Sequence, residues 1–140
     1  MTRTRALCLL SCIAVLTVAP ASSALAAQGA SPEQVAWVRR AAGKFVHAEL
    51  AGSGASVCAV LYAPLRASSH GRSCEERWNA RLARLLQRRG ERALLRVQLR
   101  GIAHAGVEVR GSSATLALAH PLLGTSTRFV WSESCWMLRG

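Results

Sequence analysis

The chain has 140 residues, 51% of them hydrophobic, with 18 basic and seven acidic residues and a formal net charge of +11 at pH 7. This length has room for one small domain, and the sequence contains no coiled-coil, repeat or low-complexity tract. Aspartate is absent, and no catalytic or ligand-binding motif of high specificity is present. The excess positive charge favours acidic partners such as envelope polymers or anionic lipid headgroups. A solvated basic face without a partner is the alternative.

The first 26 residues have the three-part organisation of a secretory signal peptide. Arg3 and Arg5 precede an uncharged apolar run over residues 6–19, and residues 24–26 form a small-x-small cleavage site. We predict that this segment is removed, which leaves residues 27–140 as one secreted or extracytoplasmic domain. An uncleaved N-terminal helix that anchors the chain in a membrane is the alternative.

Two helices are predicted at the start of this domain. Ser31 is a good N-cap, and Gln34 completes a capping box with it, so the first helix begins there and ends at Gly52. A short apolar helix follows over residues 55–63 and stops before Pro64, because the residue ahead of a proline disfavours the α conformation.

The strongest helix signal follows a loop at residues 66–72. Ser73 is the N-cap, Glu76 occupies the capping-box position, and Gly90 supplies the stop. One face is apolar and another carries a row of arginines that we expect to contact anionic surfaces; the row consists of Arg77, Arg81, Arg84 and Arg88.

After Gly90 the hydrophobic period changes from about 3.6 to 2. Leu95, Val97 and Leu99 alternate with polar residues, which predicts a strand. Two hairpins follow, the first formed by residues 107–110 and 114–120 and the second by residues 126–131 and 135–139. The predicted helices therefore precede an antiparallel sheet. This order is typical of an α+β fold in which the helices pack on one sheet.

The pattern as a whole resembles the NTF2-like superfamily, in particular its short secreted members in high-GC Gram-positive bacteria. The resemblance spans residues 33–140 and rests on "AGKFVHAELAGSGASVCAVLYAPLR", "SCEERW", "VEVRGSSATLAL" and "FVWSESCWML". It implies a conical domain whose curved sheet and helices enclose a pocket, which is catalytic in ketosteroid isomerases and polyketide cyclases and a binding or packing cavity in other members. Ser53 and Cys135 depart from the aspartate and the small residue expected at those positions.

Few residues could catalyse a reaction in such a pocket. The isomerase-like relatives use an acidic base with a tyrosine hydroxyl, whereas this chain lacks aspartate and has Tyr62 as its only tyrosine. The weak candidates for a base are Glu49 and two histidines expected on strands, His104 and His120. Either histidine could also pair with Cys135, although a small buried thiol is the simpler interpretation of that residue.

The remaining candidate contacts are aromatic. Tyr62, Trp131 and Trp136 are possible pocket-lining residues, although for all four tryptophans packing in the core is the favoured interpretation. No cofactor motif is present, and we expect no metal site because Cys58 and Cys74 lack companions at zinc-ligand spacing. Nucleic acid is not an expected partner, because the predicted export and the lack of an aromatic platform argue against it.

The cysteines are expected to stabilise the fold rather than to catalyse. Cys58 lies in the second predicted helix and Cys74 at the start of the third, with a loop between them. Three pairings are formally possible among Cys58, Cys74 and Cys135, and in an oxidising compartment we predict Cys58–Cys74, which leaves Cys135 as a free thiol.

Two functions from different classes follow from these observations. The first is a non-enzymatic secreted or envelope-associated domain that binds a small apolar ligand or a protein partner. The second is a cofactor-free isomerase, cyclase or dehydratase that works in the pocket. The absence of aspartate and the single tyrosine favour the first.

Overall fold

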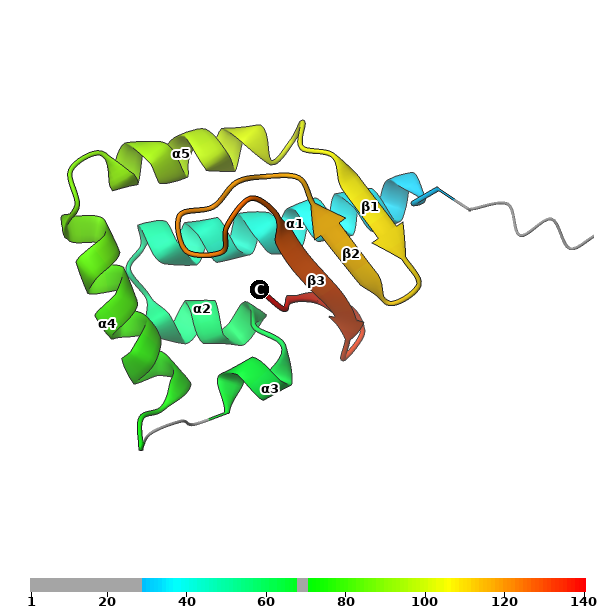
Figure 1. The fold of residues 1–140 in the computed structure, drawn as a ribbon. Coiled ribbons are helices and arrows are strands. Elements are labelled where there is room, and N and C mark those ends of the chain that lie inside the picture. The colour runs from blue at the N-terminus through cyan, green and yellow to red at the C-terminus, as the bar shows by residue number, and fades with distance from the viewer. Residues whose placement is uncertain (1–28, 68–70) are drawn as a thin grey trace, which may run out of the picture.

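A computed structural model describes residues 29–67 and 71–140, and the predicted signal peptide lies outside these residues. The described chain is an α+β domain in which helices precede an antiparallel sheet (Figure 1). The elements are α1 (Pro32–Leu50), α2 (Gly54–Val60), α3 (Ala63–Arg66), α4 (Cys74–Gln87), α5 (Glu91–Gly101), β1 (Val107–Arg110), β2 (Ser113–Leu116), β3 (Thr127–Ser132) and β4 (Cys135–Leu138).

The two capping boxes predicted from the sequence are present at the starts of α1 and α4. The Gln34 amide donates to the Ser31 hydroxyl at 3.1 Å, and the Ser31 amide donates back to Gln34 Oε1 at 2.9 Å. Ser73 and Glu76 make the same reciprocal pair, at 3.2 and 2.7 Å, and the hydrogen bonds from Ser73 lower the pKa of Glu76. Amides that the first helical turn would otherwise leave unpaired are therefore satisfied.

The strand predicted at Leu95–Leu99 is wrong, because these residues belong to helix α5. Gly90 adopts a left-handed conformation, with φ of 88°, and α5 begins directly after it. Leu95, Gln98 and Ile102 are buried at helical spacing, whereas Val97 is 54% exposed. An alternation over only five residues fits one face of a short amphipathic helix as well as it fits a strand.

The four strands form an open antiparallel sheet in the order β1-β2-β3-β4. Strand β2 is shorter than predicted and ends at Leu116, while the last hairpin turns tightly at Glu133 and Ser134, which both have positive φ angles of 52° and 63°. The register pairs Val109 with Ala114 and Phe129 with Leu138, so these side chains share the face that packs on the helices.

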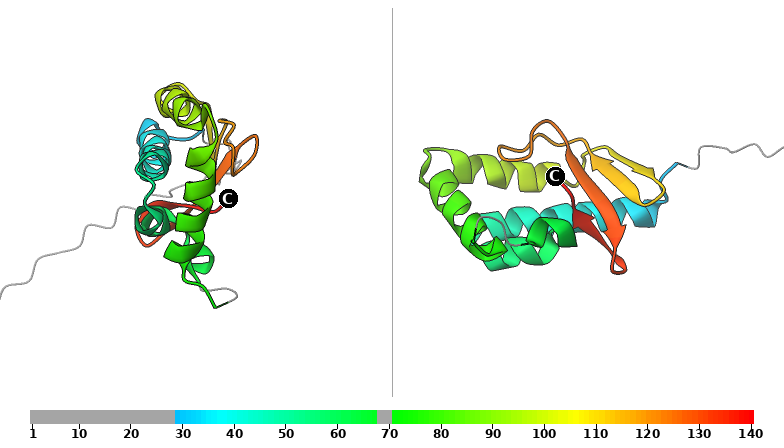
Figure 2. Two further views of the ribbon diagram at one scale, coloured as in Figure 1. Left: turned by 90° about the vertical axis from the view of Figure 1, so that its left-hand side faces the viewer. Right: turned by 60° about the horizontal axis from the view of Figure 1, so that its bottom comes forward.

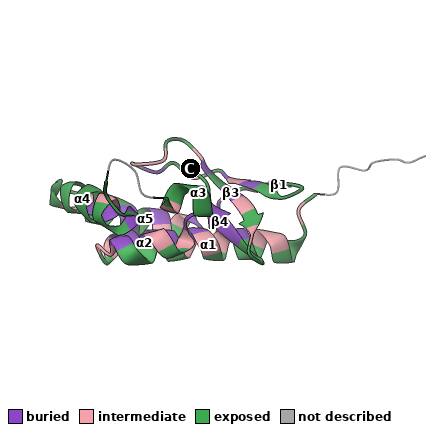
Figure 3. Ribbon diagram, turned by 90° about the horizontal axis from the view of Figure 1, so that it is seen from below, coloured by how far each residue is buried: buried purple, intermediate pink, exposed green. Residues whose placement is uncertain are grey.

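The core lies between the sheet and the helices. Helices α1 and α2 form one layer and the sheet lies over α1, while α5 runs along α1 and α4 crosses next to α2 (Figures 2 and 3). Side chains from α1, α4, α5 and β3 meet in this core and are at most 2% exposed; examples are Val38, Phe45, Leu82, Leu95 and Phe129.

The predicted disulfide between Cys58 and Cys74 is present and joins α2 to the first residue of α4, with the two Cα atoms 6.1 Å apart. The helices also approach closely at Gly54, where a Cβ atom would lie 2.6 Å from the Glu75 carbonyl oxygen. The Gly54 amide donates to Asn79 Oδ1 at 2.8 Å. Among the described residues, no helix has the length and apolar character needed to cross a membrane.

Candidate functional site

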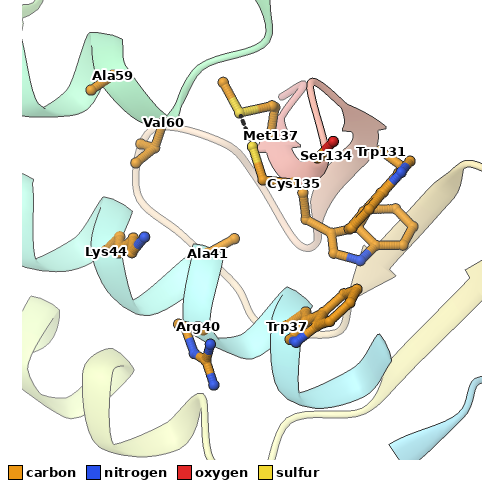
Figure 4. A pocket seen from close by; sticks show the side chains of 11 residues that line it. Trp37, Arg40, Ala41, Lys44, Ala59, Val60, Trp131, Ser134, Cys135 and Met137 are labelled. Atoms are coloured by element: carbon orange, nitrogen blue, oxygen red, sulfur yellow. Dashed lines mark hydrogen bonds between the residues drawn. The ribbon is translucent and has the colours of Figure 1, made fainter. Parts of the chain in front are cut away.

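A cleft of about 240 Å³, here named the aromatic cleft, lies between α1, α2 and the β3–β4 hairpin (Figure 4). Its character is set by three tryptophans, two cations and one thiol, with small apolar side chains between them. The residues that define it are Trp37, Arg40, Lys44, Trp131, Cys135 and Trp136.

The tryptophans form a continuous aromatic cluster. Trp37 and Trp131 stack with ring centroids 5.3 Å apart and an angle of 12° between the planes, and Trp136 meets Trp131 edge-on at 5.5 Å. The stack joins α1 to the sheet, because Trp37 lies on α1 and Trp131 lies on β3. Trp131 and Trp136 are a cross-strand pair of β3 and β4. Trp37 and Trp131 are each 37% exposed, so they are not core residues, whereas Trp136 and Trp78 are buried.

Arg40 and Lys44 give the aromatic cleft its charge. They lie one turn apart on the exposed surface of α1, and neither makes an ion pair with any described residue. No acidic side chain of the described residues lines the cleft. A ligand in this cleft would therefore meet aromatic faces and two positive charges.

The Cys135 thiol is exposed and unpaired at the rim of the aromatic cleft. Its Sγ lies 3.2 Å from Met137 Sδ and 3.4 Å from the Ser132 carbonyl oxygen, both within the same hairpin (Figure 4). Tyr62, also predicted as a pocket residue, is half-buried in the connection between α2 and α3 and does not line this cleft.

The structure brings Glu49 of α1 together with His120 in the interior. His120 Nε2 lies 2.7 Å from Glu49 Oε2, and both side chains are at most 2% exposed. The Leu122 amide donates to His120 Nδ1 at 3.1 Å, so Nδ1 carries no proton and Nε2–H is the group that donates to Glu49. The Phe45 ring lies against the imidazole with centroids 5.3 Å apart.

This pair does not form a catalytic site with Cys135. Both His120 ring nitrogens are engaged, and neither Glu49 nor His120 lines the aromatic cleft. The prediction that His104 and His120 lie on strands is wrong: His120 follows the end of β2 in a loop, and His104 is exposed in the turn after α5. The shorter β2 and the helical α5 account for both differences.

Burial raises the pKa of Glu49 above its ordinary value of 4.5, because desolvation outweighs the hydrogen bond and the charge interaction with His120, which lower it. Its Oε1 is buried and has no hydrogen-bond partner among the described residues. The folded state therefore binds the Glu49 proton more tightly than the unfolded chain does.

Stability should therefore fall as the pH rises from about 4.5 through the raised folded-state pKa of Glu49. In Glu49→Gln the amide resembles the protonated acid and cannot ionise, so we expect the wild type to lose stability relative to this variant across that range. Urea unfolding of both proteins at about pH 4 to 8 measures the difference. A difference in free energy that stays constant with pH would contradict the assignment.

The predicted arginine row is divided by the fold. Arg77, Arg81 and Arg84 line a second groove, together with Arg72 and Arg139, whereas Arg88 does not. We name it the arginine groove. Its arginines come from α4, from the residue before Ser73 and from the end of β4, which the sequence pattern of one helix could not reveal.

Among the described residues, no group of three or more histidine, cysteine, aspartate or glutamate side chains could hold a metal ion. The fold and the clefts define an α+β domain with an open four-stranded sheet, an aromatic cleft next to two cations and a separate arginine groove. The chain matches no protein-family model, no curated protein and no solved structure.

Proposed function

We propose that this chain is a non-catalytic binding domain that holds a small ligand in the aromatic cleft. The observation that carries the proposal is the half-exposed Trp37–Trp131 stack between α1 and the last hairpin. Two large aromatic side chains that remain accessible in a cleft are typical of a surface that gains contacts from a partner.

The lining of the cleft indicates the chemistry of the ligand. The indole faces favour a flat apolar or aromatic group, and Arg40 and Lys44 favour a negative charge attached to it. A volume of about 240 Å³ is below that of the clefts that enclose drug-sized molecules, so the ligand is a compact one or the end of a longer molecule.

The alternative of a cofactor-free isomerase, cyclase or dehydratase has less support. It needs an acid or base that reaches the ligand, and Glu49 and His120 are the two candidates that come together. Their polar atoms are occupied by each other and by the Leu122 amide, apart from the buried Glu49 Oε1. This arrangement favours a structural role for the pair.

We further propose that the domain is exported and belongs to the NTF2-like superfamily. The three-part N-terminal segment supports export, and the Cys58–Cys74 disulfide is consistent with an oxidising compartment. The order of helices followed by an antiparallel meander supports the family, although the sheet of the described residues is open. N-terminal sequencing of the protein from culture medium tests export, and an intact N-terminus on a cell-retained chain would contradict it.

Naphthalene-2-sulfonate is a suitable probe for the aromatic cleft, because it combines a flat aromatic ring with one negative charge. We expect calorimetric titration to detect binding to the wild type, and Trp37→Ala and Trp131→Ala to weaken it by about fivefold to tenfold through loss of ring stacking. Leu94→Ala, which removes an exposed apolar side chain of α5, is the matched control and should bind as the wild type does. Equal affinity of all four proteins would refute the site.

A further inference from the structure

The arginine groove has a volume of about 480 Å³ and lies between α4, the α2–α3 connection and the end of β4. Its rim is basic and its floor is apolar, and none of the described residues that line it has an acidic side chain. The arginines are Arg72, Arg77, Arg81, Arg84 and Arg139, and the apolar residues are Leu61, Leu65, Trp78, Leu123 and Leu138.

The arginines are held in different ways. The Arg77 guanidinium donates to the carbonyl oxygens of Leu65 and Ala67 and so fixes the end of α3 against α4. The Arg81 guanidinium lies over the Trp78 ring, 5.3 Å from its centroid. Arg84 and Arg139 lie on the groove without an ion pair to any described residue.

Three acidic side chains of the described residues pair with partners that do not line the groove. Glu49 pairs with His120, Glu108 with Arg110, and Glu133 with Arg66, which lies outside the groove. At the rim, Arg72 interacts with the side chain of Glu76. Several like charges therefore converge on one groove, an arrangement that an anionic occupant would stabilise.

We propose that the arginine groove binds the phosphate headgroup of an anionic lipid at a membrane surface. Guanidinium groups match phosphate oxygens with two parallel hydrogen bonds, which suits Arg81 and Arg84 on adjacent turns of α4. This site is separate from the aromatic cleft and does not depend on the function proposed for it.

The apolar floor distinguishes a lipid from a soluble polyanion. A polyanion needs the arginines alone, whereas a lipid also places its glycerol and first methylene groups on apolar side chains. Trp78, Leu61 and Leu138 provide that floor, and Leu65 is 40% exposed at the rim, where it can enter the interfacial layer.

Co-sedimentation with vesicles tests the proposal. We expect the protein to bind vesicles that contain phosphatidylglycerol and not vesicles of phosphatidylcholine alone, with binding that weakens as salt rises from about 0.05 to 0.5 M. Arg81→Glu/Arg84→Glu should weaken binding more than about tenfold, since the variant replaces two positive charges that attract the anionic surface with two negative ones.

The matched control is Arg96→Glu/Arg100→Glu on α5, which changes the net charge equally at exposed positions outside the groove. An equal loss in both double variants would show a net-charge effect and overturn the site. Arg84→Gln/Arg139→Gln, which keeps the contact between Arg81 and Trp78, serves as a second variant if the first fails to fold by circular dichroism.

Two further outcomes would overturn the lipid assignment. One is the absence of binding to phosphatidylglycerol vesicles at low salt. The other is tighter binding to soluble polyphosphate than to vesicles at equal phosphate concentration. Trp37→Ala should keep full vesicle binding, because Trp37 lies in the aromatic cleft and not in the arginine groove.

Discussion

Replacement of His120 by alanine is expected to lower the free energy of unfolding by about 3 to 5 kcal/mol, because it leaves a buried polar group without its hydrogen-bond partner and opens a cavity in the interior. The change would leave the Glu49 carboxyl group, which is 0% exposed, without the Nε2–H that donates to Oε2. It would also remove the acceptor of the Leu122 amide and the ring that packs against Phe45.

A double-mutant cycle separates the free energy of the Glu49–His120 hydrogen bond from the free energy of packing around the two side chains. Glu49→Ala in the His120→Ala background should cost less than Glu49→Ala alone, because the unpaired acid has already lost its partner. Chemical denaturation of the four proteins in urea gives the coupling free energy. Additive effects, or a loss below about 1 kcal/mol in His120→Ala, would contradict a stabilising role for the hydrogen bond.

Local signals explain most of what could be predicted from the sequence. The capping boxes at Ser31 and Ser73 depend on residues three positions apart, and both helices begin where these boxes place them. The second hairpin was marked by apolar segments on both sides of a short polar turn at residues 132–134. Helix α5 was missed because Leu95, Val97 and Leu99 alternate over a window too short to separate the two periods.

The candidate sites could be predicted only in part, because they depend on contacts between distant residues. Glu49 and His120 were separate candidates, and their 71-residue separation conceals the hydrogen bond between them. Trp37 lies at helical core spacing, yet it stacks on Trp131 at the edge of the core. A signal for this exposure was Arg40 three residues further along the chain, because residues at this spacing lie on the same side of a helix and an arginine is typical of the solvent-facing side.

Removal of the disulfide by Cys58→Ala/Cys74→Ala is expected to cost about 3 kcal/mol, because the bond closes a loop with 15 residues between the cysteines and reduces the entropy of the unfolded chain. That loss is a large part of the roughly 5 to 15 kcal/mol that stabilises a domain of this size. The bond also fixes α2 against the first turn of α4, which forms one wall of the arginine groove. Urea unfolding of the oxidised wild type and the variant measures the effect.

The control for this experiment is Cys135→Ala, which removes an exposed thiol outside the bond and should leave the stability within about 0.5 kcal/mol of the wild type. Reduced wild type should resemble Cys58→Ala/Cys74→Ala, since both lack the cross-link. Peptide mapping without reductant that finds Cys135 joined to either partner would overturn the pairing. If the pairing holds, the free energy of unfolding is lower in a reducing compartment, where the disulfide is absent. The predicted export would then stabilise the domain, because the bond persists in an oxidising compartment.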